Sequence, residues 1–184
     1  LDLLKGLSLS PEAIAKQKNM KIVYTPLHGT GVKLVPQFLN ALGFENVIHV
    51  PEQDINDGNF PTVQSPNPEE ASALKMAIDK AVAENADLVM ATDPDADRIG
   101  IAVRDNNNQL ILLNGNQSAA ILTYYLLRKW KENAKLTGNE YIVKTIVTTD
   151  LLTVIADHYG VGHYNVLTGF KYIADVILHN ENKK

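Results

Sequence analysis

The chain has 184 residues, of which 17 are basic and 21 acidic, so its formal net charge is −4, and it has no cysteine. The missing cysteines exclude a disulfide framework, a thiolate metal site and a thiol nucleophile, and the negative charge gives no support to nonspecific binding of nucleic acid or an anionic membrane. Because no apolar run approaches the roughly 18 residues that span a bilayer and the first residues lack the features of a signal peptide, we expect a cytoplasmic protein of one or two domains with no nucleic-acid or membrane partner.

Strands and helices are expected to alternate over the first 113 residues. Strands are expected at the short β-branched or apolar runs, which are residues 21–24, 47–50, 88–91 and 99–103. The polar residues 105–108 follow the last run and predict a hairpin turn. One helix is expected to begin after Ser10, a second to end at Gly43, and a third to begin at Asn67. At this third position an N-cap residue, a proline and carboxylates suit a helix start. Behind that last start, one helical face is predicted to carry Leu74, Ile78, Ala81 and Val82.

From Asn114 the alternation starts again. Helices are expected at residues 117–132, 151–159 and 170–179, and strands at residues 141–147 and 164–167. Such alternation indicates an α/β protein with mixed or largely parallel sheets. The change of unit near Leu113 predicts two domains, residues 1–113 and 114–184.

Four polar loops each follow a predicted strand. They are residues 28–31, 93–98, 148–150 and 168–169. In open α/β sheets, ligands bind at the carboxyl ends of the strands. We therefore expect the functional groups in these loops.

The loop at residues 93–98 carries the clearest chemistry. Asp93, Asp95 and Asp97 are separated only by proline and alanine, so they repel one another unless a cation lies among them. Mg²⁺ prefers such oxygen ligands and leaves room for a phosphate oxygen, and Arg98 adds a fork of donors suited to phosphate. A solvated acidic turn is the alternative. A calcium-binding EF-hand is excluded, because Arg98 and Arg104 stand where that loop needs glycine and glutamate, and the pattern of a haloacid-dehalogenase-type phosphatase is absent.

Two further loops could bind an anion. His28 and Gly29 begin a short turn whose amides could cradle a phosphate, although the full nucleotide-binding pattern is absent and a tight strand-to-helix turn is the alternative. Thr168 and Gly169 precede Lys171 in a first helical turn, where the amine could meet a phosphate or sugar hydroxyl, or be an ordinary surface lysine.

Four motifs together resemble those of a known family. They are TPLHGTG at 25–31, DGNFP with NPE at 57–61 and 67–69, DPDADR at 93–98, and LTGFK at 167–171. Their order over residues 21–177 is similar to that of the α-D-phosphohexomutases, above all to the phosphoglucomutase/phosphomannomutase branch of Gram-positive type.

The resemblance implies two similar three-layer α/β/α domains with mixed, largely parallel sheets. Residues 1–113 would be the metal-loop domain, the second of four, and residues 114–184 part of the third, ending before its sugar-recognition loop. The first residue is not Met and the chain ends abruptly at Lys184, so we expect both ends to be cuts in a longer chain. Domains 1 and 4 would then be missing, and the chain alone would be inactive.

The resemblance also implies a mechanism and its residues. A phosphoserine from another domain would exchange a phosphoryl group with a hexose phosphate through a hexose bisphosphate, with Mg²⁺ held by Asp93, Asp95 and Asp97. Arg98 would stabilise the transferring group, and Lys171 would contact the sugar phosphate and assist proton transfer. The remaining residues implied to line the substrate site are His28, Gly29, Thr168 and Gly169.

Several alternatives remain open. Glucose is the expected sugar, but phosphomannomutase, phosphoglucosamine mutase and phosphopentomutase belong to the same family. A metal-dependent phosphatase would use the same loop for other chemistry. A noncatalytic α/β module that binds a divalent metal is the alternative of a different class.

Overall fold

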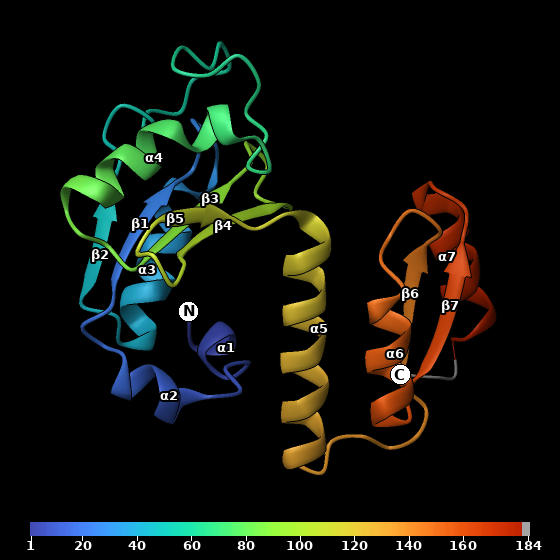
Figure 1. Cartoon of the computed structure of the whole chain (residues 1–184). Helices are drawn as coiled ribbons and strands as arrows, with labels where there is room; N and C mark the ends of the chain where they lie inside the picture. The colour runs from blue at the N-terminus through green and yellow to red at the C-terminus, as the bar shows by residue number, and fades with distance from the viewer. Residues whose placement is uncertain (182–184) are drawn as a thin grey trace. The chain divides into compact units, whose positions relative to one another are not determined.

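A computed structural model describes residues 1–181. It has two compact units, Leu1–Gly115 and Asn116–Lys184 (Figure 1). The predicted end of the second domain falls on residues 182–184, which lie outside the described residues.

The first unit is built on a five-stranded sheet. Its strands are β1 (Lys21–Thr25), β2 (Asn46–His49), β3 (Leu88–Thr92), β4 (Ile99–Arg104) and β5 (Leu110–Leu112), in the order β2-β1-β3-β4-β5. β1 is parallel to β2 and β3, whereas β4 is antiparallel to β3 and β5. The predicted mixed sheet is confirmed, but here it is not largely parallel, because β4 is antiparallel to β3 as well as to its hairpin partner β5, so that two of the four pairings are antiparallel.

Helices cover both faces of this sheet. They are α3 (Gly31–Leu42) and α4 (Ala71–Ala83), and the short helices α1 (Asp2–Lys5) and α2 (Pro11–Lys16) precede β1 in the chain. Side chains alternate between the faces of a strand, and Val23 and Val89 share a buried core with Leu74 and Ala77 of α4. The neighbouring Tyr24 points to the other face, where its hydroxyl lies against the start of α3. The unit therefore has three layers.

Helix α4 differs from the prediction at its start and on its surface. Asn67 closes a turn instead, since its Oδ1 accepts the Glu69 amide (3.1 Å) and its carbonyl accepts the Glu70 amide (3.0 Å). The helix begins only at Ala71. Val82, predicted on the apolar face, is 62% exposed. It lies about 100° around the helix from Ala81, which is buried.

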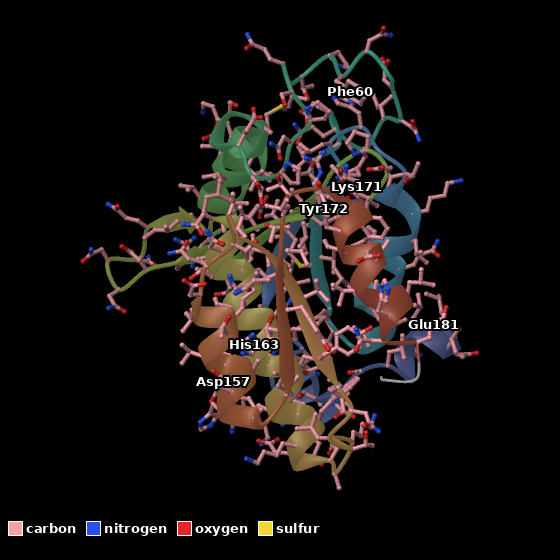
Figure 2. All side chains as sticks on the ribbon, turned by 90° about the vertical axis from the view of Figure 1, so that its right-hand side faces the viewer. Phe60, Asp157, His163, Lys171, Tyr172 and Glu181 are labelled. Carbon is pink, nitrogen blue, oxygen red and sulfur yellow. The ribbon has the colours of Figure 1, made fainter. Side chains whose placement is uncertain are left out.

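The second unit contains a parallel pair of strands and three helices. In order they are α5 (Gly115–Glu132), β6 (Tyr141–Thr145), α6 (Leu151–Tyr159), β7 (Gly162–Val166) and α7 (Phe170–His179). Helices α6 and α7 lie on opposite sides of the strand pair (Figures 1 and 2). Accordingly, Ile142 packs against a buried cluster that includes Ala156 of α6, whereas the Tyr164 hydroxyl donates to Asn180 at the end of α7 (2.9 Å). The layering resembles that of the first unit, but the described residues provide two strands instead of five.

Both strands of this pair differ from the predicted bounds. β6 ends at Thr145, two residues early, because the Thr148 amide turns back to the Thr145 carbonyl (2.9 Å). β7 begins at Gly162, two residues before the predicted start, and pairs with Tyr141 there. Among the described helices, none is both long and apolar enough to cross a membrane.

Glu140 anchors the turn before β6 and predicts a pH effect. Its carboxylate accepts the Thr137 hydroxyl (2.7 Å) and the amides of Thr137 (2.9 Å) and Gly138 (3.0 Å), which together lower its pKa to about 2 from 4.5. A pKa lowered by folding stabilises the protein at pH values above the unfolded pKa, and the effect is lost as the pH falls toward 2. Urea unfolding should show that Glu140→Gln has a lower free energy of unfolding than the unaltered chain at pH 7, and that this difference becomes smaller below pH 4.5. A difference in free energy that does not change with pH would contradict this account.

Thr153 in α6 provides a second stability prediction. Its buried Oγ1 has no hydrogen-bond partner among the described residues, and an unpaired buried hydroxyl destabilises a fold by about 1 kcal/mol or more. Thr153→Val keeps the shape and removes the hydroxyl. We expect it to raise the free energy of unfolding by about 0.5–1 kcal/mol in urea, and a loss of stability would show that the hydroxyl has a partner.

Candidate functional site

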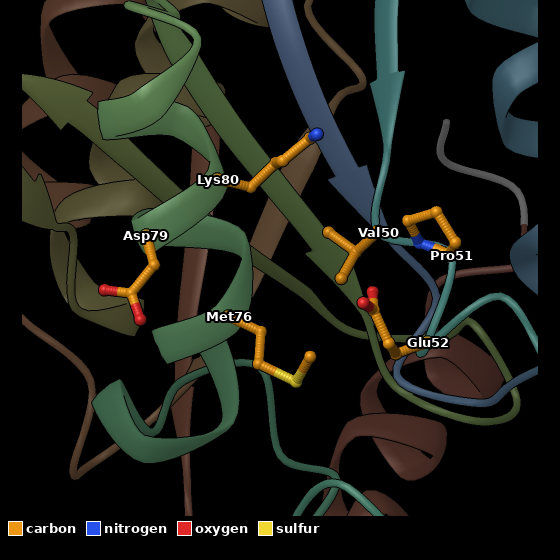
Figure 3. Close-up of a pocket in the computed structure, with 6 residues that line it drawn as sticks. All are labelled: Val50, Pro51, Glu52, Met76, Asp79 and Lys80. Carbon is orange, nitrogen blue, oxygen red and sulfur yellow. The ribbon is translucent and has the colours of Figure 1, made fainter.

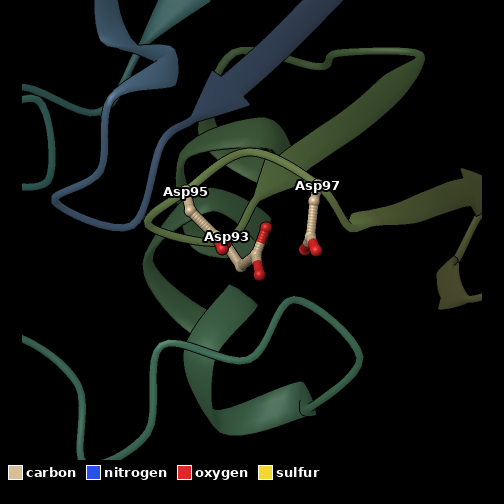
Figure 4. A group of neighbouring side chains, drawn as sticks. All are labelled: Asp93, Asp95 and Asp97. Carbon is tan, nitrogen blue, oxygen red and sulfur yellow. The ribbon is translucent and has the colours of Figure 1, made fainter. Parts of the chain in front are cut away.

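The three aspartates of the loop after β3 lie together. Oxygen atoms from the carboxylates of Asp93, Asp95 and Asp97 come within 4.8 Å of one another (Figure 4). Asp93 is buried at the end of its strand, whereas Asp95 and Asp97 are exposed. Ala96 turns the loop with a φ of 61°, and its amide donates to the Asp93 carbonyl (3.0 Å). The loop is thus a compact turn with its carboxylates gathered on it.

Arg98 holds the buried carboxylate in place. The Arg98 amide donates to Oδ1 of Asp93 (2.9 Å), and its Nε donates to Oδ2 (2.7 Å). Burial raises the pKa of Asp93, but the two bonds from Arg98, a hydrogen bond with Asp95 and the charge of Arg98 together leave the pKa below its ordinary value. Asp93 is therefore ionised, and its orientation is fixed by a bond to each oxygen.

The exposed aspartates are less well compensated. The charge of Asp95, then burial, then the charge of Asp93 raise the pKa of Asp97, and the Nε atom of Arg98 lies 3.8 Å from Asp97 Oδ1. A cation among the three carboxylates would remove this repulsion. The donor set consists of carboxylate oxygens alone, and each Asp93 oxygen keeps a second lone pair beside its bond to Arg98. The set therefore fits a hard divalent ion such as Mg²⁺.

The turn at residues 28–31 packs directly on this loop. The Thr30 amide (2.8 Å) and hydroxyl (3.1 Å) both donate to the carbonyl of Pro94. A Cβ on Gly29 would overlap the backbone of Pro94, so only glycine permits the approach. The structure thus brings two of the predicted loops together, through Thr30, a contact that the sequence analysis did not predict.

The His28 side chain is hydrogen-bonded to the long loop at residues 51–66. Its Nδ1 meets the Ile55 carbonyl and its Nε2 the Thr62 hydroxyl, both at 2.8 Å, and the residue is 1% exposed. Both ring nitrogens are thus used to fasten that loop. A role of His28 in substrate binding stays a prediction. Because both ring nitrogens bind the loop at residues 51–66, such a role would be indirect, through the position of that loop.

The remaining predicted residues belong to the second unit. Gly169 precedes α7 with a φ of 124°, where glycine is favoured. Thr168 and Lys171 are exposed, and the Lys171 amine lies 4.8 Å from the centre of the Tyr172 ring (Figure 2). The aspartates, Arg98 and His28 belong to the first unit, so the predicted site residues are divided between the two units.

The second unit also holds a buried amine that the sequence analysis missed. The Lys144 side chain is 3% exposed, and its Nζ donates to the Thr148 carbonyl (3.0 Å) and to Asp150 Oδ1 (2.9 Å). It fastens the polar loop after β6. The available signal was a lysine as the one charged residue of a strand.

A surface hollow beside α4 takes no part in the predicted site. It lies between α4 and the segment after β2 (Figure 3) and is lined by Val50, Pro51, Glu52, Met76, Asp79 and Lys80. None of these is a predicted site residue.

Comparison with known proteins identifies the family to which the chain is similar. The model described as "Phosphoglucomutase/phosphomannomutase, alpha/beta/alpha domain II" matches residues 2–107, and the model of domain III matches residues 114–182. A phosphomannomutase of Mycoplasmoides pirum is 41% identical over 164 residues, 89% of this chain and 29% of its own length. A phosphoglucomutase of Staphylococcus haemolyticus is 41% identical over 161 residues, 88% of this chain and 29% of its own. The chain thus spans about 29% of the length of these relatives.

Solved structures share the fold at lower identity. A phosphoglucomutase/phosphomannomutase family protein from Burkholderia thailandensis has a TM-score of 0.70 at 18% identity, over 94% of this chain and 36% of its own. The Aspergillus fumigatus N-acetylphosphoglucosamine mutase, in complex with GlcNAc-6P and magnesium, has a TM-score of 0.57 at 15% identity, over 93% of this chain and 34% of its own. A variant of the same enzyme in complex with glucose 1,6-bisphosphate has a TM-score of 0.56 at 16% identity, over 93% of this chain and 33% of its own.

Proposed function

Because the chain belongs to the phosphoglucomutase/phosphomannomutase family, of which it contains domains II and III, we propose that it is the central part of a phosphohexomutase. The enzyme would interconvert hexose 1-phosphate and hexose 6-phosphate through a phosphoserine and a bisphosphate, and would belong to the isomerases. Glucose is the proposed sugar. A phosphomannomutase and a phosphoglucomutase are equally identical to this chain, so mannose phosphate is the first alternative.

The observation that carries the proposal is the cluster of Asp93, Asp95 and Asp97 with Arg98 bound to it. The carboxylates lie within 4.8 Å of one another at the carboxyl end of β3, and the loop fits a hard divalent cation. The A. fumigatus enzyme was solved with magnesium. When bound, Mg²⁺ would neutralise phosphoryl oxygens and so lower the barrier to their transfer.

Arg98 is proposed to bind the transferring phosphoryl group. Its Nε is used by Asp93, and the guanidinium carries further N–H donors that suit phosphate oxygens. The side chain is 55% exposed and can be reached by a substrate. Binding through one end while the other end is anchored fixes the orientation of the donors.

The second unit is proposed to bind the sugar phosphate. Thr168, Gly169 and Lys171 lie in the loop after β7 and the first turn of α7, where amides and an amine can meet an anion. Lys171 would contact the phosphate and assist proton transfer. In the first unit, Gly29 and His28 would shape the wall beside the aspartates.

The other partners are proposed to be the rest of a full-length mutase and its substrates. The chain spans 29% of its relatives' length, so the phosphoserine and the distal phosphate site would come from domains I and IV. Hexose phosphate and hexose bisphosphate are the proposed ligands, as complexes of the A. fumigatus enzyme suggest. The chain alone would not catalyse the reaction.

A chimeric enzyme tests this function. The matching segment of the S. haemolyticus phosphoglucomutase is replaced by this chain, and glucose 6-phosphate formation from glucose 1-phosphate is followed with a coupled dehydrogenase. We expect conversion by the chimera and none by the isolated chain. A folded chimera without conversion would contradict the proposal, and phosphate release from glucose 1-phosphate by the chain alone would favour the phosphatase alternative.

A further inference from the structure

We propose that Thr30 is a positioning residue for the aspartate loop, which it holds through the carbonyl of Pro94. The inference rests on the proposed function, since it assigns to Thr30 a role in the metal affinity of Asp93, Asp95 and Asp97.

Pro94 is the point at which the loop can be held. It joins two of the proposed ligands, Asp93 and Asp95, and proline has a fixed φ and no amide hydrogen. Its carbonyl is therefore the only hydrogen-bonding group that the residue offers. That carbonyl accepts both the Thr30 amide (2.8 Å) and the Thr30 hydroxyl (3.1 Å).

The use of the Thr30 hydroxyl is informative because another role was available to it. Thr30 is the N-cap residue of α3, a position at which a threonine hydroxyl ordinarily accepts an amide of the first turn. Here the side chain makes no such bond. The hydroxyl is instead bonded to a carbonyl 64 residues away, in the aspartate loop.

The neighbours of Thr30 reinforce this contact. Gly29 allows its backbone to lie against Pro94, and Gly31 lies over the buried pair of Tyr24 and Thr92, whose hydroxyls are 2.8 Å apart. The segment 29–31 thus touches the consecutive segment 92–94. Since Asp95 and Asp97 are exposed, their positions depend on how well this backbone is held.

Groups that orient metal ligands contribute to affinity although they do not touch the metal. Loss of such a partner typically lowers metal affinity by about 10- to 100-fold. Thr30→Val removes the hydroxyl bond and keeps the amide bond, so we expect the lower end of that range, about tenfold. Thr30→Ser keeps both donors.

The test is Mn²⁺ binding to the 184-residue chain, measured by the loss of the electron paramagnetic resonance signal of free Mn²⁺. We expect about tenfold weaker binding by Thr30→Val and binding within about twofold of the unaltered chain by Thr30→Ser. Thr153→Val, the same substitution in α6, is the matched control and should bind like the unaltered chain. Thermal unfolding without metal separates a loosened loop from a damaged fold.

Each outcome of these binding measurements supports or overturns the role of Thr30. Equal Mn²⁺ affinity of Thr30→Val and the unaltered chain would overturn the role of Thr30 and leave the metal site intact. Thr30→Ser binding as weakly as Thr30→Val would also overturn it, because the hydroxyl would not be responsible. If the unaltered chain bound no Mn²⁺, both this role and the proposed metal site would be wrong.

Discussion

Asp95→Asn is expected to lower the turnover of the chimeric phosphoglucomutase by about a hundredfold or more while the protein stays folded. Asp95 is exposed and lies within a cluster whose carboxylate oxygens are within 4.8 Å of one another. The amide removes one negative charge and one anionic ligand from the proposed metal site, and phosphoryl transfer depends on charge neutralisation and exact placement more than on any other contribution of the protein.

The control for this variant is Asp79→Asn on α4. Asp79 is exposed and, among residues 1–181, forms an ion pair only with Lys75, four residues away on the same helix, and such pairs contribute little to stability. Turnover measured in the coupled assay should be unchanged in the control. Unchanged turnover in Asp95→Asn at saturating Mg²⁺ would contradict the assignment of Asp95 to the metal.

Gly29→Ala is expected to destabilise the first unit by about 1–3 kcal/mol and to weaken Mn²⁺ binding. A Cβ at this position would overlap the Cα and carbonyl of Pro94. Both are backbone atoms, which no side-chain rotation can move away. The aspartate loop must therefore shift as a whole, and the bonds from Thr30 to Pro94 are lost with it.

Gly58→Ala is the matched control, because a Cβ on Gly58 meets nothing within 4 Å. Urea unfolding followed by circular dichroism should show a lower midpoint for Gly29→Ala and a change within about 0.5 kcal/mol for Gly58→Ala. Equal midpoints for the two variants would mean that the loops at 28–31 and 93–98 are free to separate.

Local sequence patterns predicted much of this fold, because strands and helices have short periods. The runs at 21–24, 88–91 and 99–103 became β1, β3 and β4. The helix predicted from Asn67 failed at its start, since residues suited to an N-cap are equally suited to a turn that closes on itself.

The aspartates could be found from the sequence because they are contiguous. The bond from Thr30 to the carbonyl of Pro94 in their loop could not, since it joins residues 64 positions apart and leaves no periodic trace. Lys144 was missed for a related reason, because a lysine in a strand does not reveal that the Thr148 carbonyl and Asp150 will enclose it. Which loops meet is decided by the sheet order, and sequence periodicity does not contain that order.

The central claim is that Asp93, Asp95 and Asp97 hold a divalent cation. Titration of the ¹⁵N-labelled chain with MgCl₂, followed in amide NMR spectra, tests it directly. We predict saturable shifts concentrated at residues 95–98 and at Thr30, and their loss in Asp95→Asn. Spectra that do not change, or shifts that persist in Asp95→Asn, would contradict it.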